Sequence, residues 1–199
     1  MLKNIAFPSL LALSLTACAT AVPPVEVTRF HIDNPARSGT VAIEEMAGNP
    51  DVGLEFRTYA AAVDQELQRV GFTRAAEGTK SEYVALVGFR RTFREPNSYG
   101  ANGKPVSVGV GGAVGSGGYS GLGVGIGINL SGKPKGQVVT ELQVQLRRRA
   151  DSTTVWEGRA QTEAREGTPA SQPGLAAQKL AAALIGGYPG ESGRTISVK

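Results

Sequence analysis

Apolar and polar residues alternate with a period of two in the first part of the chain. The segments Val25–Ile32 and Gly39–Met46 are rich in β-branched and aromatic residues and follow this alternation loosely. Because successive strand residues face opposite sides of a sheet, a period of two is typical of strands with one buried face. The pattern predicts two strands joined through the turn-forming pair Asn34-Pro35.

Two other segments repeat their apolar residues every three or four positions, which is the spacing of an amphipathic helix. In the first segment these residues are Phe56, Tyr59, Ala60, Val63, Leu67 and Val70. We expect this helix to begin near Asn49-Pro50-Asp51 and to end at Gly71, where a left-handed residue closes the last turn. The second helix is predicted over Pro173–Gly186, because proline suits a first helical turn and glycine follows a last one.

Further strands are predicted toward the middle and the end of the chain. Tyr83–Phe89 is apolar on both faces, as expected for a strand inside a sheet with cover on each side. Val138–Arg147 and Thr153–Ala164 predict an antiparallel hairpin that places Trp156 in the core. Thr195–Val198 adds a last strand.

Together these elements predict the α+β class. We expect one mixed, largely antiparallel sheet with two helices packed on it and a glycine-rich β-hairpin insertion. About 180 residues are enough for one sizeable core, so residues 25–199 are expected to form a single domain.

The predicted insertion is a glycine-rich segment in which ten of the nineteen residues from Gly109 to Gly127 are glycine. Apolar residues alternate with glycine or serine at both of its edges, so residues 106–130 predict a β-hairpin whose middle, Gly111–Gly121, is a turn or an unstructured loop. Its apolar residues form a candidate partner surface: Val108, Val110, Leu122, Val124, Ile126 and Ile128.

Three interpretations of this hairpin are open. In the first, its apolar face packs against the domain. In the second, that face binds a partner or a second copy of the chain by strand addition. In the third, the hairpin contacts a membrane through the spacings Gly111-x-x-x-Gly115 and Gly117-x-x-x-Gly121. The third is disfavoured, because such spacings act within an apolar helical span of about 20 residues, whereas the period here is that of strands.

The amino terminus carries an export signal. Lys3 precedes an apolar stretch, Ile5–Leu15, that is too short to span a bilayer, and the sequence Leu15-Thr16-Ala17-Cys18 resembles the lipobox of bacterial lipoproteins. Residues 1–17 are therefore expected to be a signal peptide and Cys18, the single cysteine, to carry covalent lipid. Residues 18–24 then form a lipidated tether.

This resemblance also implies a location. In bacterial lipoproteins a residue other than Asp after the cysteine implies sorting to the outer membrane, and position 19 is Ala19. We expect the domain to face the periplasm and to be held to the membrane stably, because two or more acyl chains retain a protein where one does so only marginally.

Charge excludes one class of partner. Removal of residues 1–17 takes away Lys3 and no carboxylate, so 21 Lys+Arg become 20 against 17 Asp+Glu. A balance of +3 is weak for a nucleic-acid binder. The arginine clusters, Arg90-Arg91-Arg94 and Arg147–149, are expected at solvated strand ends, with contact to anionic lipid or polymer as the alternative.

Catalytic and cofactor motifs are not supported. Gly127–Lys133 begins like a phosphate-binding loop, but Pro134 stands where that motif needs a Ser or Thr hydroxyl. His31, the single histidine, lies in a predicted strand without a recognisable nucleophile motif. Glu44-Glu45 and Asp51 lack the spacing of a calcium loop. We therefore expect no cofactor, no metal and no catalytic residue.

The order of parts supplies a family resemblance. A helix ending Leu67-x-x-Val70-Gly71-Phe72 precedes the strand Ser81–Val87, the glycine-rich insertion, the segment Val155-Trp156-Glu157-Gly158 and a helix that runs into Tyr188-Pro189. With the lipobox, this order resembles the domain of unknown function 4136 family of bacterial lipoproteins. The resemblance implies location and architecture and supplies no catalytic residues.

The leading functional hypothesis is a non-enzymatic envelope lipoprotein whose domain binds an envelope protein or polymer through the hairpin 106–130. The first alternative is a hydrolase or transferase with an unrecognised site, which requires a cleft with convergent polar groups. The second is a self-assembling structural protein.

Overall fold

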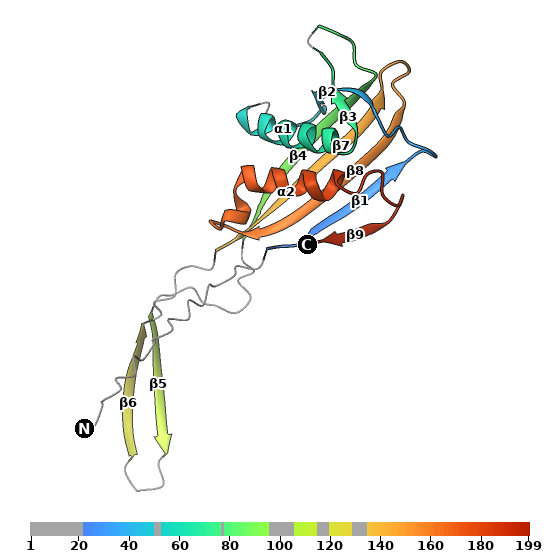
Figure 1. The fold of residues 1–199 in the computed structure, drawn as a ribbon. Coiled ribbons are helices and arrows are strands. Elements are labelled where there is room, and N and C mark those ends of the chain that lie inside the picture. The colour runs from blue at the N-terminus through green and yellow to red at the C-terminus, as the bar shows by residue number, and fades with distance from the viewer. Residues whose placement is uncertain (1–21, 50–52, 77, 96–105, 115–119, 129–134) are drawn as a thin grey trace, which may run out of the picture.

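A seven-stranded mixed sheet with the order β3-β2-β4-β7-β8-β1-β9 forms the body of the protein (Figure 1). The computed structural model describes residues 22–49, 53–76, 78–95, 106–114, 120–128 and 135–199, of which 106–114 and 120–128 are described by backbone alone. The elements are β1 Val25–His31, β2 Gly39–Glu45, α1 Leu54–Arg69, β3 Phe72–Arg74, β4 Tyr83–Arg94, β5 Val106–Val114, β6 Ser120–Ile128, β7 Gln137–Arg148, β8 Thr154–Arg165, η1 Pro169–Ser171, α2 Pro173–Ile185 and β9 Thr195–Val198.

The predicted α+β class is confirmed. Strands β4, β7, β8, β1 and β9 pair antiparallel in succession, while β2 pairs parallel with both β3 and β4. The first two predicted strands, β1 and β2, are not neighbours in the sheet. Helix α1 follows β2 and returns the chain along the sheet, so the next strands pair parallel with β2, while β1 pairs with β8.

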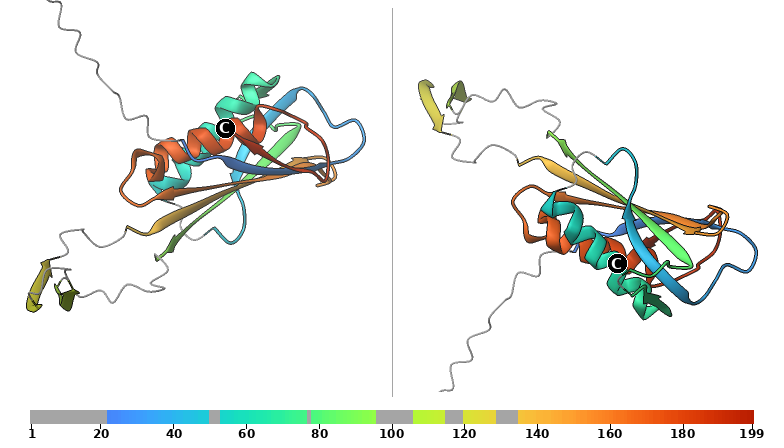
Figure 2. Two further views of the ribbon diagram at one scale, coloured as in Figure 1. Left: turned by 90° about the horizontal axis from the view of Figure 1, so that it is seen from below. Right: turned by 90° about the horizontal axis from the view of Figure 1, so that it is seen from above.

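Both helices cover the same face of the sheet (Figure 2). Buried side chains of α1, including Tyr59 and Leu67, and of α2, including Leu180, pack there, and Trp156 is buried in this core as predicted. No helix in the described part of the chain is long and apolar enough to cross a membrane.

The opposite face of the sheet is polar. It carries Glu141, Gln143 and Gln145 of β7 and Arg159 of β8, which forms an ion pair with Glu141 at 3.4 Å. Tyr83–Phe89 lies inside the sheet as predicted. Both described helices cover one of its faces, and on the other face Val84 is buried and Met46 and Asn49 lie against Gly88.

The end of α1 follows the predicted cap, and a short strand, β3, comes directly after it. Gly71 has a φ of +113°, the left-handed conformation expected at this position. Phe72 begins β3 and is buried, and its ring centroid lies 5.9 Å from that of Tyr83 and 5.6 Å from that of Tyr188. A strand of three residues is too short to produce a detectable alternation.

The glycine-rich segment forms a second, two-stranded antiparallel sheet from β5 and β6. Its strands continue to Val114 and resume at Ser120, further into the segment than the alternation predicted. Glycine retains both backbone hydrogen-bonding groups, so the ladder extends past the last alternating apolar residue. Leu130, assigned to this hairpin from the sequence, lies outside the described residues.

Candidate functional site

The register of the β5–β6 hairpin places all six residues of the predicted partner surface on one face. Residues directly opposite each other in an antiparallel pair share a face. Val108 is opposite Ile126 and Val110 is opposite Val124. Two positions beyond the Val110–Val124 pair, Leu122 is opposite Gly112, and two positions beyond the Val108–Ile126 pair, Ile128 is opposite Val106.

The other face of the hairpin consists mainly of glycine. Gly109 is opposite Gly125, Gly111 is opposite Gly123, and Ser107 is opposite Gly127. A strand face without side chains lets another backbone approach closely. The hairpin therefore has one apolar face and one bare face, an arrangement suited to packing against another sheet or strand.

The hairpin and the amino-terminal segment are connected to the same end of the main sheet. At this end β4 and β8 finish at Arg94 and Arg165, and β7 begins at Gln137 (Figure 1). The start of β1 lies there too, because Val25 pairs with Thr162, three residues before the end of β8. We call this end of the sheet, with the adjoining starts of α1 and α2, the Arg94 pole. Cys18 itself lies outside the described residues.

Arg91 holds the elements of the Arg94 pole together. Its guanidinium donates a hydrogen bond to the carbonyl oxygen of Ser171, just before α2, at 2.9 Å, and forms an ion pair with Glu55, in the first turn of α1, at 3.4 Å. The same guanidinium lies 6.0 Å from the centre of the Phe93 ring. One side chain thus fixes the starts of both helices relative to the end of β4.

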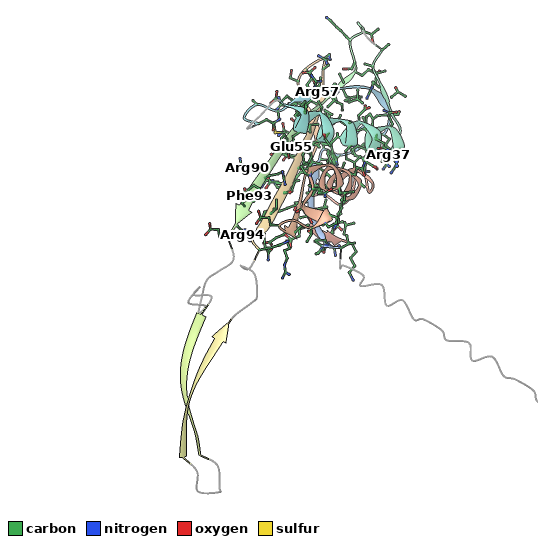
Figure 3. The ribbon with its side chains drawn as sticks, turned by 90° about the vertical axis from the view of Figure 1, so that its left-hand side faces the viewer. Arg37, Glu55, Arg57, Arg90, Phe93 and Arg94 are labelled. Carbon is green, nitrogen blue, oxygen red and sulfur yellow. The ribbon has the colours of Figure 1, made fainter. Side chains whose placement is uncertain are left out.

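Large apolar side chains are exposed at this pole. Leu54 at the start of α1 is 78% exposed, Phe93 near the end of β4 is 65% exposed and Leu175 in the first turn of α2 is 49% exposed. Val22, which precedes β1, is 68% exposed. Figure 3 shows Phe93 and Arg94 at the end of β4, beyond Glu55 and Arg90.

Charged side chains lie at the same end of the sheet, and by register Arg90, Arg94 and Arg165 are on the face opposite Phe93. Arg90, Arg94, Lys135 and Arg165 are exposed cations of the pole, and Arg94 forms an ion pair with Glu163 at 3.2 Å. Exposed carboxylates there include those of Glu26, Glu95 and Glu166.

The residues that precede β1 are bound to the rest of the domain. The side chain of Lys179, in α2, donates a hydrogen bond to the carbonyl oxygen of Pro23, and Thr162 donates one to that of Pro24 at 2.9 Å. Burial lowers the pKa of the Lys179 ammonium group. The chain preceding β1 is thus held against α2 and β8 at the Arg94 pole.

A hollow of about 650 Å³ lies at the other end of the sheet, lined by Lys80–Tyr83 and Arg148–Ala150. Arg149 donates hydrogen bonds to the hydroxyl of Ser81 and to the carboxylate of Glu44, the latter at 2.8 Å. A serine nucleophile needs a base to remove its proton, whereas Ser81 accepts hydrogen bonds from a cation. The arrangement at this hollow is that of an ion-pair network.

His31 has backbone partners. Its Nδ1 lies 2.8 Å from the carbonyl oxygen of Ile32 and its Nε2 lies 3.1 Å from that of Gly190. Among the residues that the structure describes, no three His, Cys, Asp or Glu side chains come together as potential metal ligands. His31 therefore connects β1 to the segment that follows α2.

The sequence did not single out Arg29, although this charged side chain is buried. Arg29 is 5% exposed and donates hydrogen bonds to the carbonyl oxygens of Ala183 and Leu184, at 2.7 and 2.8 Å. Burial lowers the pKa of its guanidinium. A signal was present, because Arg29 follows Val25 and Val27 on the inward side of the β1 alternation.

Comparison with known proteins gives a family match over most of the chain. The family model described as "Domain of unknown function (DUF4136)" matches residues 32–190. An uncharacterized protein of Zymomonas mobilis subsp. mobilis is 32% identical over 90% of this chain and 82% of its own length.

Two solved structures are distantly similar. A PelC dodecamer from Paraburkholderia phytofirmans has 13% identity and a TM-score of 0.41 over 81% of this chain and 94% of that one. A PDZ domain protein from Parabacteroides distasonis has 14% identity and a TM-score of 0.49 over 88% of this chain and 39% of that one. We draw nothing about activity from either similarity.

Proposed function

Because the chain belongs to the DUF4136 family, as its motif order indicated, and carries a lipobox, we propose that it is an outer-membrane lipoprotein. In this proposal lipid on Cys18 anchors the protein, the domain faces the periplasm, and its role is to bind another envelope component or to support the envelope without catalysis.

One observation carries the proposal. The lipobox ends at Cys18, and the tether enters the domain at the Arg94 pole, where Lys179 and Thr162 bind its last two residues before β1. The glycine-rich hairpin is inserted between β4 and β7 at the same pole. An anchor on Cys18 would thus keep the insertion on the membrane-proximal side of the domain.

The partner surface in this proposal is the apolar face of the β5–β6 hairpin. Its six residues share one face by register, and the glycine face behind them leaves room for a second layer. The alternative of a hydrolase or transferase is less well supported, because the hollow at the far end of the sheet is lined by an ion-pair network that occupies Ser81 and Arg149.

The anchor is tested by replacing Cys18 with serine. We expect the wild-type chain, grown with an alkyne-tagged palmitate, to be labelled and to fractionate with outer membranes. Cys18→Ser should lose the label and leave the membrane fraction while its melting temperature stays the same. The same label and fractionation in both chains would refute the anchor.

The partner surface is tested by photo-crosslinking in intact cells. A photoreactive residue at position 124, on the apolar hairpin face, should give a discrete adduct, and the same residue at Thr153, in the β7–β8 turn, should not. The proposal fails if both positions give the same products or if neither reacts. An adduct of two copies of the chain would assign the surface to self-assembly.

A further inference from the structure

We propose that the Arg94 pole is a lipid-binding surface, on which Leu54, Phe93 and Leu175 enter the interfacial layer of an anionic phospholipid membrane. This inference rests on the proposed function, since it takes that membrane to be the one in which Cys18 is anchored. It adds a noncovalent contact that orients the domain.

The length of the tether limits the distance between this pole and the membrane. Four peptide units separate Cys18 from Val22, so their Cα atoms can be at most about 14 Å apart. The polar headgroup region of a leaflet is itself about 5–7 Å thick. Even a fully extended tether therefore keeps the pole close to the headgroups.

The apolar residues are placed for insertion. Leu54, Phe93 and Leu175 come from α1, β4 and α2, and each is about half exposed or more. Arg91 connects these elements through Ser171 and Glu55, so the three side chains project from elements that are joined at this end of the sheet. Single exposed apolar residues are common on protein surfaces; three on separate elements at one end, beside the attachment point of a lipid tether, indicate a specific occupant.

The charges suit an anionic surface. Arg90, Arg94, Lys135 and Arg165 are exposed at the same end of the sheet as the apolar residues. Basic side chains near a membrane are attracted to lipid phosphates. Carboxylates reduce this field: Glu163 pairs with Arg94, and Glu26, Glu95 and Glu166 lie nearby. Both the apolar contact and the cations are therefore required, as in other proteins that lie on a membrane.

Vesicle flotation tests the surface without the anchor. The mature chain carrying Cys18→Ser has no acyl group, and we expect it to float with vesicles of phosphatidylglycerol and phosphatidylcholine. It should float much less with phosphatidylcholine alone or at high salt. Adding Leu54→Ser, Phe93→Ser and Leu175→Ser should reduce the bound fraction about tenfold. The control, Phe30→Ser with Ile32→Ser, alters exposed apolar residues elsewhere and should bind normally.

A second measurement reports on the pole directly. Phe93→Trp in the same chain should show an emission shift to shorter wavelength when anionic vesicles are added, against the constant signal of the buried Trp156. The inference is overturned if the Cys18→Ser chain ignores anionic vesicles, or if the triple variant and its control lose binding equally. It is also overturned if the triple variant still binds vesicles and differs from the Cys18→Ser chain only in having lost dimerisation. Palmitate labelling of Cys18 is unaffected by these outcomes, so failure of the surface and failure of the anchor are distinguishable.

Discussion

The guanidinium of Arg29 donates a hydrogen bond from its Nε atom to the main-chain carbonyl oxygen of Leu184, at 2.8 Å. Leu184 lies in the last turn of α2, where carbonyl groups lack helical partners and the helix dipole favours a cation. A side chain from β1 thus closes the end of a helix more than 150 residues later in the sequence.

Replacing Arg29 with methionine should lower the free energy of unfolding by about 2–3 kcal/mol, because two carbonyl groups lose a charged donor in a buried site. Arg159→Met is the matched control: Arg159 is exposed and pairs with Glu141 at 3.4 Å, so its loss should cost at most about 1 kcal/mol. Urea denaturation measures both values. Equal losses in the two variants would refute a capping role for Arg29.

Gly158 allows β8 to pack closely against α2. A Cβ atom at this position would lie 2.7 Å from Cδ1 of Leu184 and 2.8 Å from the ring of Trp156, both of which are buried. We expect Gly158→Ala to destabilise the protein by about 1–3 kcal/mol through overpacking. Gly174→Ala, in α2 with nothing within 4 Å, should instead be neutral or stabilise by up to about 1 kcal/mol. Thermal melts that show the same sign for both changes would contradict this.

The Tyr59 hydroxyl is buried and has no hydrogen-bond partner among the described residues, while its ring stacks on Phe89 at a centroid distance of 4.5 Å. Tyr59→Phe keeps the stack and removes an unsatisfied polar group, so the free energy of unfolding should stay the same or rise by about 1 kcal/mol. Chemical denaturation measures it. A clear loss of stability would show that the hydroxyl has a partner.

Tyr188 makes stability sensitive to high pH. Burial raises its pKa to about 12, and its hydroxyl donates to the carbonyl oxygen of Ala36 at 2.6 Å. In the unfolded chain the pKa is about 10, so the folded state keeps a proton that the unfolded state has lost. The stability that Tyr188 gives to the folded state through this pKa difference is fully present below pH 10 and is lost as the pH rises to about 12.

Tyr188→Phe should therefore cost about 1 kcal/mol at pH 7 through the lost hydrogen bond. It should also lose less stability than the wild type between pH 10 and pH 12. The readout is the difference between the two denaturation curves across that range, because the other tyrosines titrate in both proteins. Parallel curves would contradict the assignment to Tyr188.

The sequence by itself determined the local elements. Helix α2 over Pro173–Ile185 and the β7–β8 hairpin follow from apolar periodicity and turn residues, and both were predicted. Trp156 in the core follows from the same alternation. These features depend on residues a few positions apart, so the chain specifies them before any long-range contact forms. The sequence Leu15–Cys18, which resembles a lipobox, is likewise a local signal.

Only the tertiary structure decided which distant segments meet. Three features join residues that are far apart in the sequence. They are the pairing of β1 with β8, the hydrogen bonds of Arg29 to the end of α2, and the position of Leu54, Phe93 and Leu175 at one pole. Periodicity assigns a residue to a face, but strand order and hydrogen-bond partners depend on how the whole sheet is packed. For this reason an arginine in a strand and a leucine at a helix start looked ordinary in the sequence.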